Sequence, residues 1–76
     1  PDFDYILSHK KVCMVTDSKI GPHGICREIQ KRNLEKTVVV GENLSYANER
    51  ITIGKAKDIL SVDKFDMNVM EILDEK

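Results

Sequence analysis

The side chains with the most chemical capacity gather in one short stretch of the chain, between Gly41 and Arg50. The stretch contains two carboxylates, two amides, a phenol and a guanidinium: Glu42, Asn43, Tyr46, Asn48, Glu49 and Arg50. Together these groups can donate and accept the hydrogen bonds that a polar ligand requires. Glu49 and Arg50 are neighbours of opposite charge, so a structural ion pair between them is as consistent with the sequence as a contact to substrate.

A second polar pair, Asp17 and Ser18, directly follows the apolar run 12–16. A carboxylate at the end of a strand can accept hydrogen bonds from ribose hydroxyls. Asp and Ser are equally typical as caps of a following helix, and both interpretations stay open. His23 has no second histidine or nucleophile placed to form a relay with it, so we predict a surface residue without catalytic role.

Four side chains of the types that bind zinc occur in the first third of the chain: His9, Cys13, His23 and Cys26. Zinc ligands converge from turns and helix ends, whereas Cys13 lies inside an apolar run typical of a core strand. Two cysteines are also too few for the disulfide framework of a small secreted domain. We therefore predict no metal site and two reduced, buried thiols.

The expected elements follow from the apolar patterns. Strands are predicted at 12–16, 37–40, 50–53 and 68–73, and helices at 22–33 and 55–60, within a single domain of residues 1–76. Residues 1–9 are expected to be a connector, the tail of a helix that enters from preceding sequence. The first predicted strand has no polar alternation, which indicates a strand covered on both faces. Asn33 suits the left-handed cap at the end of the first helix, with Leu34 folding back.

A strand, a helix and a strand within about 30 residues predict a βαβ unit with two parallel strands. The short loop before residue 50 predicts that the third strand is antiparallel to its neighbour. The fold class is thus α/β, with a mixed sheet in the order β-α-β-β-α-β. Parallel strands end at the same edge of a sheet, so residues 16–18 and 41–43 are expected to lie close together at the edge where ligands of α/β sheets bind.

The composition excludes several classes of protein. Twelve Lys and Arg residues against thirteen Asp and Glu give a net charge of −1, without the basic surplus of a nucleic-acid-binding protein. No apolar stretch approaches the ~20 residues that span a membrane, and the chain has no signal-peptide pattern. We predict a cytoplasmic protein with no nucleic-acid or membrane partner.

The run from Val38 to Gly54, VVVGENLSYANERITIG, resembles the second-domain signature of the tetrapyrrole methylases. It is most similar to the branch of cobalt-precorrin-7 C5-methyltransferases, also called precorrin-6Y methylases, of cobalamin biosynthesis. The strand end at 15–19 and the segment 65–70 fit the same family, so the similarity covers residues 11–73. In the family pattern Pro-Asp stands where this chain has Ala47 and Asn48, a change that loosens the loop without removing a catalytic group.

The resemblance implies the C-terminal domain of an enzyme about three times longer. Such an enzyme transfers a methyl group from S-adenosylmethionine to a ring carbon of a cobalt-precorrin, and the family allows a homodimer. The cofactor would lie in the cleft between this domain and a missing N-terminal methylase domain. Carried over to this chain, the cofactor contacts are Thr16, Asp17, Asn43, Leu44 and Tyr46, mainly through backbone groups. No catalytic residue is implied here, and the fragment alone is expected to be inactive.

One alternative comes from another class of protein. A free-standing α/β binding or regulatory module could use the same sheet edge for a small nucleotide-like anion. A glycine-rich methylase half encoded in frame upstream of Pro1 would favour the enzyme, and its absence would favour the module.

Overall fold

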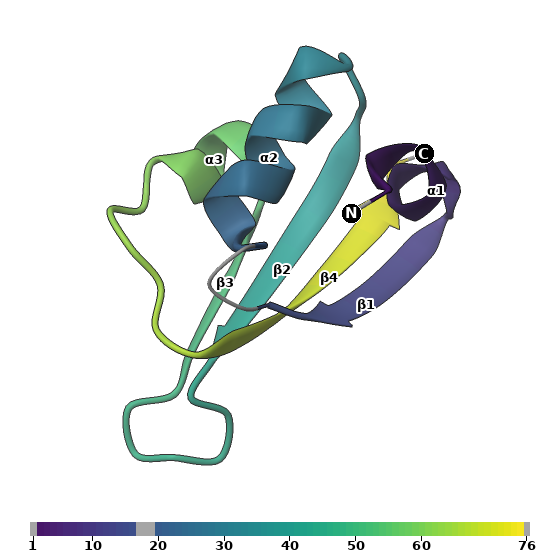
Figure 1. Ribbon diagram of the computed structural model, residues 1–76. Coiled ribbons are helices and arrows are strands. Elements are labelled where there is room, and N and C mark those ends of the chain that lie inside the picture. The colour runs from purple at the N-terminus through teal and green to yellow at the C-terminus, as the bar shows by residue number, and fades with distance from the viewer. Residues whose placement is uncertain (1, 17–19, 76) are drawn as a thin grey trace.

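The chain folds around one sheet whose strand order is β1-β4-β2-β3 (Figure 1). The computed structural model describes residues 2–16 and 20–75. Over those residues the elements are α1 (Phe3–Ser8), β1 (Lys11–Val15), α2 (Pro22–Lys31), β2 (Lys36–Glu42), β3 (Arg50–Gly54), α3 (Ala56–Leu60) and β4 (Asn68–Asp74). The predicted order β-α-β-β-α-β is confirmed, with one further helix ahead of it. None of the helices in this part of the chain is long and apolar enough to cross a membrane.

The pairing of the strands corrects the predicted mixed sheet. β4 lies between β1 and β2 and is antiparallel to both, and β3 is antiparallel to β2. β1 and β2 therefore run in the same direction, as the βαβ pattern predicts, but they are not hydrogen-bonded to each other. The reason is that β4 inserts between them, and the strand–helix–strand pattern contains no information about a partner that arrives some 30 residues later in the chain.

The core occupies one face of the sheet. Alternate residues of β2 and β4 point toward α2 and α3, as the two-residue period of a strand requires. The buried apolar residues are Leu7, Ile25, Cys26, Ile29, Val38, Val40, Ala56, Ile59, Met70 and Ile72. α2 and α3 cover this face, so the domain has two layers.

The opposite face of the sheet, which we call the open sheet face, carries apolar side chains that no helix of the described residues covers. Val15, Val69, Gly41 and Ile51 lie side by side across the four strands. Val15 is 79% exposed and Ile51 is 50% exposed. The prediction that the first strand is covered on both faces is thus wrong for the described residues, and Cys13 is exposed rather than buried.

The helix ends follow local signals. Pro22 begins α2, and Asn33 takes a left-handed conformation with φ 57°, as predicted. The Leu34 N–H donates to the Ile29 carbonyl at 3.1 Å, which completes the cap. α1 begins at Phe3, and the Asp2 side chain caps it by accepting a hydrogen bond from the Tyr5 N–H.

Gly54 is the glycine where a side chain would do most harm. A Cβ atom there would lie 2.8 Å from Asp58 Cβ and 2.9 Å from Asp58 Oδ2. Asp58 cannot easily move, because its Oδ2 accepts the Lys55 N–H at the start of α3. We expect Gly54→Ala to lower the free energy of unfolding by about 1–3 kcal/mol, measured by urea denaturation.

Gly24→Ala is the matched control, because Gly24 lies in α2 with nothing within 4 Å of a new Cβ atom. Alanine favours the helix over glycine, so this change should raise the free energy of unfolding by up to about 1 kcal/mol. Equal effects of the two substitutions would contradict the close packing of β3 on α3.

Candidate functional site

The two strand ends that the sequence predicted to meet do lie along one edge of the sheet, on either side of the start of β4. The Thr16 N–H donates to the Asn68 carbonyl at 3.4 Å, and the Asn43 N–H donates to the Met67 carbonyl at 3.0 Å. Each strand end thus contacts the segment leading into β4 instead of the other strand end. We call this region, made by Thr16, residues 43–46 and residues 66–68, the strand-end edge. Asp17 and Ser18 lie outside the described residues.

Residues 43–49 form a loop between β2 and β3 that projects beyond the sheet (Figure 1). Two consecutive turns build it: the Tyr46 N–H donates to the Asn43 carbonyl at 2.9 Å, and the Glu49 N–H donates to the Tyr46 carbonyl at 3.1 Å. Asn43 and Ser45 have positive φ values of 49° and 72°. The Glu49 carboxylate accepts the Ser45 N–H at 2.8 Å, so Glu49 holds the loop in shape.

Glu42 ties the base of this loop to the segment before β4. Its side chain is 3% exposed, and its two oxygens accept hydrogen bonds from Arg50 Nε at 2.5 Å and from the Asp66 N–H at 2.8 Å. The Arg50 guanidinium also lies 5.7 Å from the centre of the Phe65 ring. The ion pair expected between Glu49 and Arg50 does not form, because Arg50 pairs with Glu42. Sequence reasoning missed this role of Glu42. The feature that could have indicated a buried carboxylate is its position two residues after Val40, on the inward side of β2.

The Glu42–Arg50 ion pair makes the free energy of unfolding depend on pH in the acid range. The hydrogen bond from Arg50 holds the pKa of Glu42 below its ordinary value. The stabilisation is therefore complete above the unfolded pKa of about 4.3 and is lost as the pH falls through the lower folded value. We expect Glu42→Gln to be less stable than the wild type at neutral pH, and the difference to shrink below about pH 4. Urea midpoints measured from neutral to acid pH test this, and a difference that stays constant would contradict it.

Three of the predicted cofactor residues line one hollow at the strand-end edge. Asn43, Leu44 and Tyr46 surround a space of about 220 Å³ with parts of β1, β2 and β4. Tyr46 is 65% exposed. Thr16 does not line this hollow. It lines a separate hollow of about 480 Å³, together with His23.

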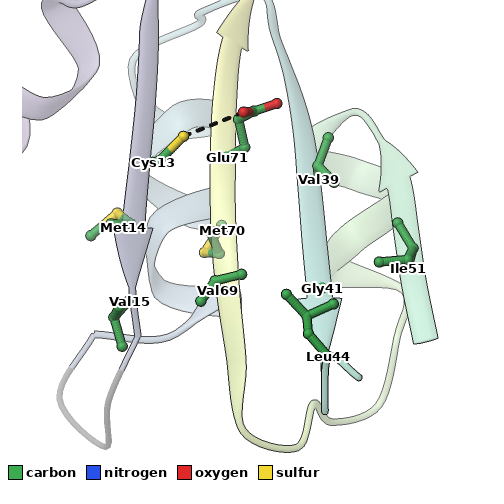
Figure 2. Close-up of a pocket in the computed structure, with 10 residues that line it drawn as sticks. All are labelled: Cys13, Met14, Val15, Val39, Gly41, Leu44, Ile51, Val69, Met70 and Glu71. Atoms are coloured by element: carbon green, nitrogen blue, oxygen red, sulfur yellow. Dashed lines mark hydrogen bonds between the residues drawn. The ribbon is translucent and has the colours of Figure 1, made fainter. Parts of the chain in front are cut away.

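A larger hollow, of about 490 Å³, lies on the adjoining open sheet face (Figure 2). The Leu44 side chain reaches the sheet over Gly41, where an added Cβ atom would lie 3.0 Å from Leu44 Cδ2. Leu44 lines both hollows, as do Val15, Gly41 and Val69. At the other end of the larger hollow the Cys13 thiol donates to Glu71 at 3.3 Å.

The candidate metal ligands lie in unrelated environments. His23, predicted as a surface residue, is half-buried beside a hollow, with Nε2 2.6 Å from the Val62 carbonyl and its ring packed on Phe65. Burial raises the pKa of the Cys26 thiol to about 11. Across residues 2–16 and 20–75, no three His, Cys, Asp or Glu side chains are grouped as metal ligands. The absence of zinc stays a prediction, because its stated reason, a buried Cys13, does not hold.

Two known proteins are similar to this chain in sequence. The chain is 39% identical, over 75 residues, to proteins from Salmonella typhimurium (strain LT2) and Salmonella typhi. Each of these is named cobalt-precorrin-7 C(5)-methyltransferase, which confirms the resemblance found in the sequence. The match covers 97% of this chain and 36% of each relative, so the chain spans about a third of their length. No family model and no solved structure matches the chain.

Proposed function

We propose that the chain is the C-terminal domain of an S-adenosylmethionine-dependent methyltransferase that acts on a cobalt-precorrin in cobalamin biosynthesis. The observation that carries the proposal is the 39% identity to the Salmonella enzymes across 97% of the chain, a span that includes both strand ends. Because the chain spans only about a third of those enzymes, the remaining parts of the active site belong to sequence outside these residues.

The strand-end edge fits one wall of a cofactor site. The hollow of about 220 Å³ is smaller than the roughly 300–1,000 Å³ of complete ligand pockets, so a second wall is needed to enclose a nucleoside. The exposed Tyr46 ring and the Leu44 side chain offer apolar surface to an adenine, and Asn43 offers an amide. Thr16 would contact the same ligand from the β1 side of the edge.

The role of these residues is to bind and orient. When bound, S-adenosylmethionine supplies an electrophilic methyl group. The chain's contribution is to hold the adenosine so that the methyl group faces the substrate, and such positioning accounts for a large part of the rate in two-reactant transfers. The two turns and the Glu49 side chain keep residues 43–46 in one conformation, which lowers the entropic cost of binding.

A chimeric enzyme tests the proposal. The segment of the Salmonella typhimurium relative that matches this chain is replaced by residues 1–76, and transfer of a labelled methyl group to the relative's substrate is measured. We expect the chimera to be active. A chimera that folds, by circular dichroism, and transfers no methyl group contradicts the proposal.

A matched pair of variants links that activity to the loop. Ser45 has φ 72°, a conformation that glycine adopts readily and a β-branched residue does not. In the chimera, Ser45→Gly should therefore retain activity, whereas Ser45→Val should lose most of it. Equal activities would mean that the loop conformation does not matter for methyl transfer.

A further inference from the structure

The strand ends of β1 and β2 are separated by the start of β4, yet one chain of hydrogen bonds joins them. The Thr16 hydroxyl donates to Asn68 Oδ1 at 2.7 Å. The Asn68 amide nitrogen donates in turn to the Asp66 carbonyl at 2.7 Å. The Asp66 carboxylate accepts from the Asn43 amide at 3.2 Å. Hydrogen bonds thus link Thr16 to Asn43 through Asn68 and Asp66, with the Asp66 backbone carbonyl on one side and its carboxylate on the other.

Asn68 is the central member of this chain of contacts. It is 9% exposed, and it lines both the hollow beside Thr16 and the hollow beside Tyr46. Its side-chain oxygen accepts a hydrogen bond from Thr16, which follows β1, and its side-chain nitrogen donates to the Asp66 carbonyl. Only an amide offers an acceptor and a donor in this shape, because a carboxylate accepts at both oxygens and an apolar side chain does neither.

We propose that Asn68 is a positioning residue, which fixes Thr16 relative to the loop residues 43–46 so that both can contact one ligand. The inference rests on the proposed function, since it concerns the same cofactor edge. Asn68 acts through Thr16 and Asp66, and its own side chain is occupied by them.

The Asn68 side-chain amide is not required to pair the strands. The backbone of β4 pairs with β1 from Val15 to Lys11 and with β2 from Glu42 to Lys36, and these ladders do not involve the Asn68 side chain. The side chain is therefore not needed for the order of the strands, and its hydrogen bonds to Thr16 and Asp66 add to the backbone contacts that hold the two strand ends.

The test is a titration of the 76-residue chain with S-adenosylhomocysteine, in which the NMR chemical shifts of the backbone amides are measured. The readout is the initial slope of each shift against ligand concentration, compared between residue 16 and residues 43–46. In the wild type we expect both groups to respond. In Asn68→Ala we expect the slope at residue 16 to fall roughly fivefold, the effect of losing about one hydrogen bond, and the slopes at residues 43–46 to fall less, so that the ratio between the groups changes.

Two further variants keep the test decisive. Asn68→Asp is nearly isosteric and keeps the acceptor for Thr16 but places a carboxylate oxygen against the Asp66 carbonyl, so it should also change the ratio. Ile29→Val, in the buried face of α2, lowers stability without touching the edge and should leave the ratio unchanged.

The possible results separate the two proposals. A wild-type chain with no response at either group overturns the proposed function and this inference with it. A wild-type response that Asn68→Ala and Asn68→Asp leave unchanged overturns the role of Asn68 alone. A ratio that Ile29→Val changes as much as Asn68→Ala would assign the effect to stability and also overturn the role.

Discussion

The 76-residue chain alone should transfer no detectable methyl group from labelled S-adenosylmethionine to a cobalt-precorrin. The chain spans about a third of the Salmonella enzymes that it matches, and its hollow at the strand-end edge forms one wall of a site. Holding two reactants together contributes about 7–11 kcal/mol to such a reaction, and a single wall cannot supply it. The measurement is incorporation of label into the macrocycle.

The chimera described above is the control for this experiment. It contains the same 76 residues in a complete enzyme, so a failure caused by the label, the substrate or the folding of this segment would appear in both samples. Turnover by the 76-residue chain in the absence of any other protein would contradict the split site.

Ile59→Ala should lower the free energy of unfolding by about 2–5 kcal/mol. Ile59 is 0% exposed on α3 and packs in the core, so removing its outer atoms leaves a cavity. A domain of this size has only about 5–10 kcal/mol of total stability, and the variant should be partly unfolded at 37 °C. Urea denaturation followed by circular dichroism measures the loss.

Ile53→Ala is the matched control, since it removes the same atoms from the open sheet face. Ile53 is 66% exposed, and the change should cost no more than about 0.5 kcal/mol. Equal losses at the two positions would contradict a core on one face of the sheet. In the chimera a larger loss from Ile53→Ala would indicate that the rest of the enzyme covers the open sheet face.

The elements that the sequence predicted well are those fixed by neighbouring residues. α2 begins at a proline and is followed, two residues after its last residue, by an asparagine with positive φ, and both features depend on contacts within a few residues. The position of β4 depends on pairing with strands about 30 and 55 residues earlier in the chain, and no local pattern encodes it. The parallel direction of β1 and β2 was therefore predictable, but their separation by β4 was not.

The candidate site divides in the same way. Asn43, Leu44 and Tyr46 came from the resemblance of one continuous run, and the structure brings them to one hollow. Asp66 and Asn68 were missed because their partners lie just after β1, in β2 and at the start of the loop, and their residue types are ordinary for a turn.

The most direct test of the cofactor edge is the location of the amide shifts that S-adenosylhomocysteine causes in the 76-residue chain. Few contacts remain without a second wall, so we expect an affinity on the order of millimolar or weaker. The account predicts shifts confined to the strand-end edge, at the amides of residue 16, residues 41–46 and residues 66–68. Shifts centred on the opposite edge of the sheet, near Lys11 and Thr37 where β1 and β2 begin, would contradict it.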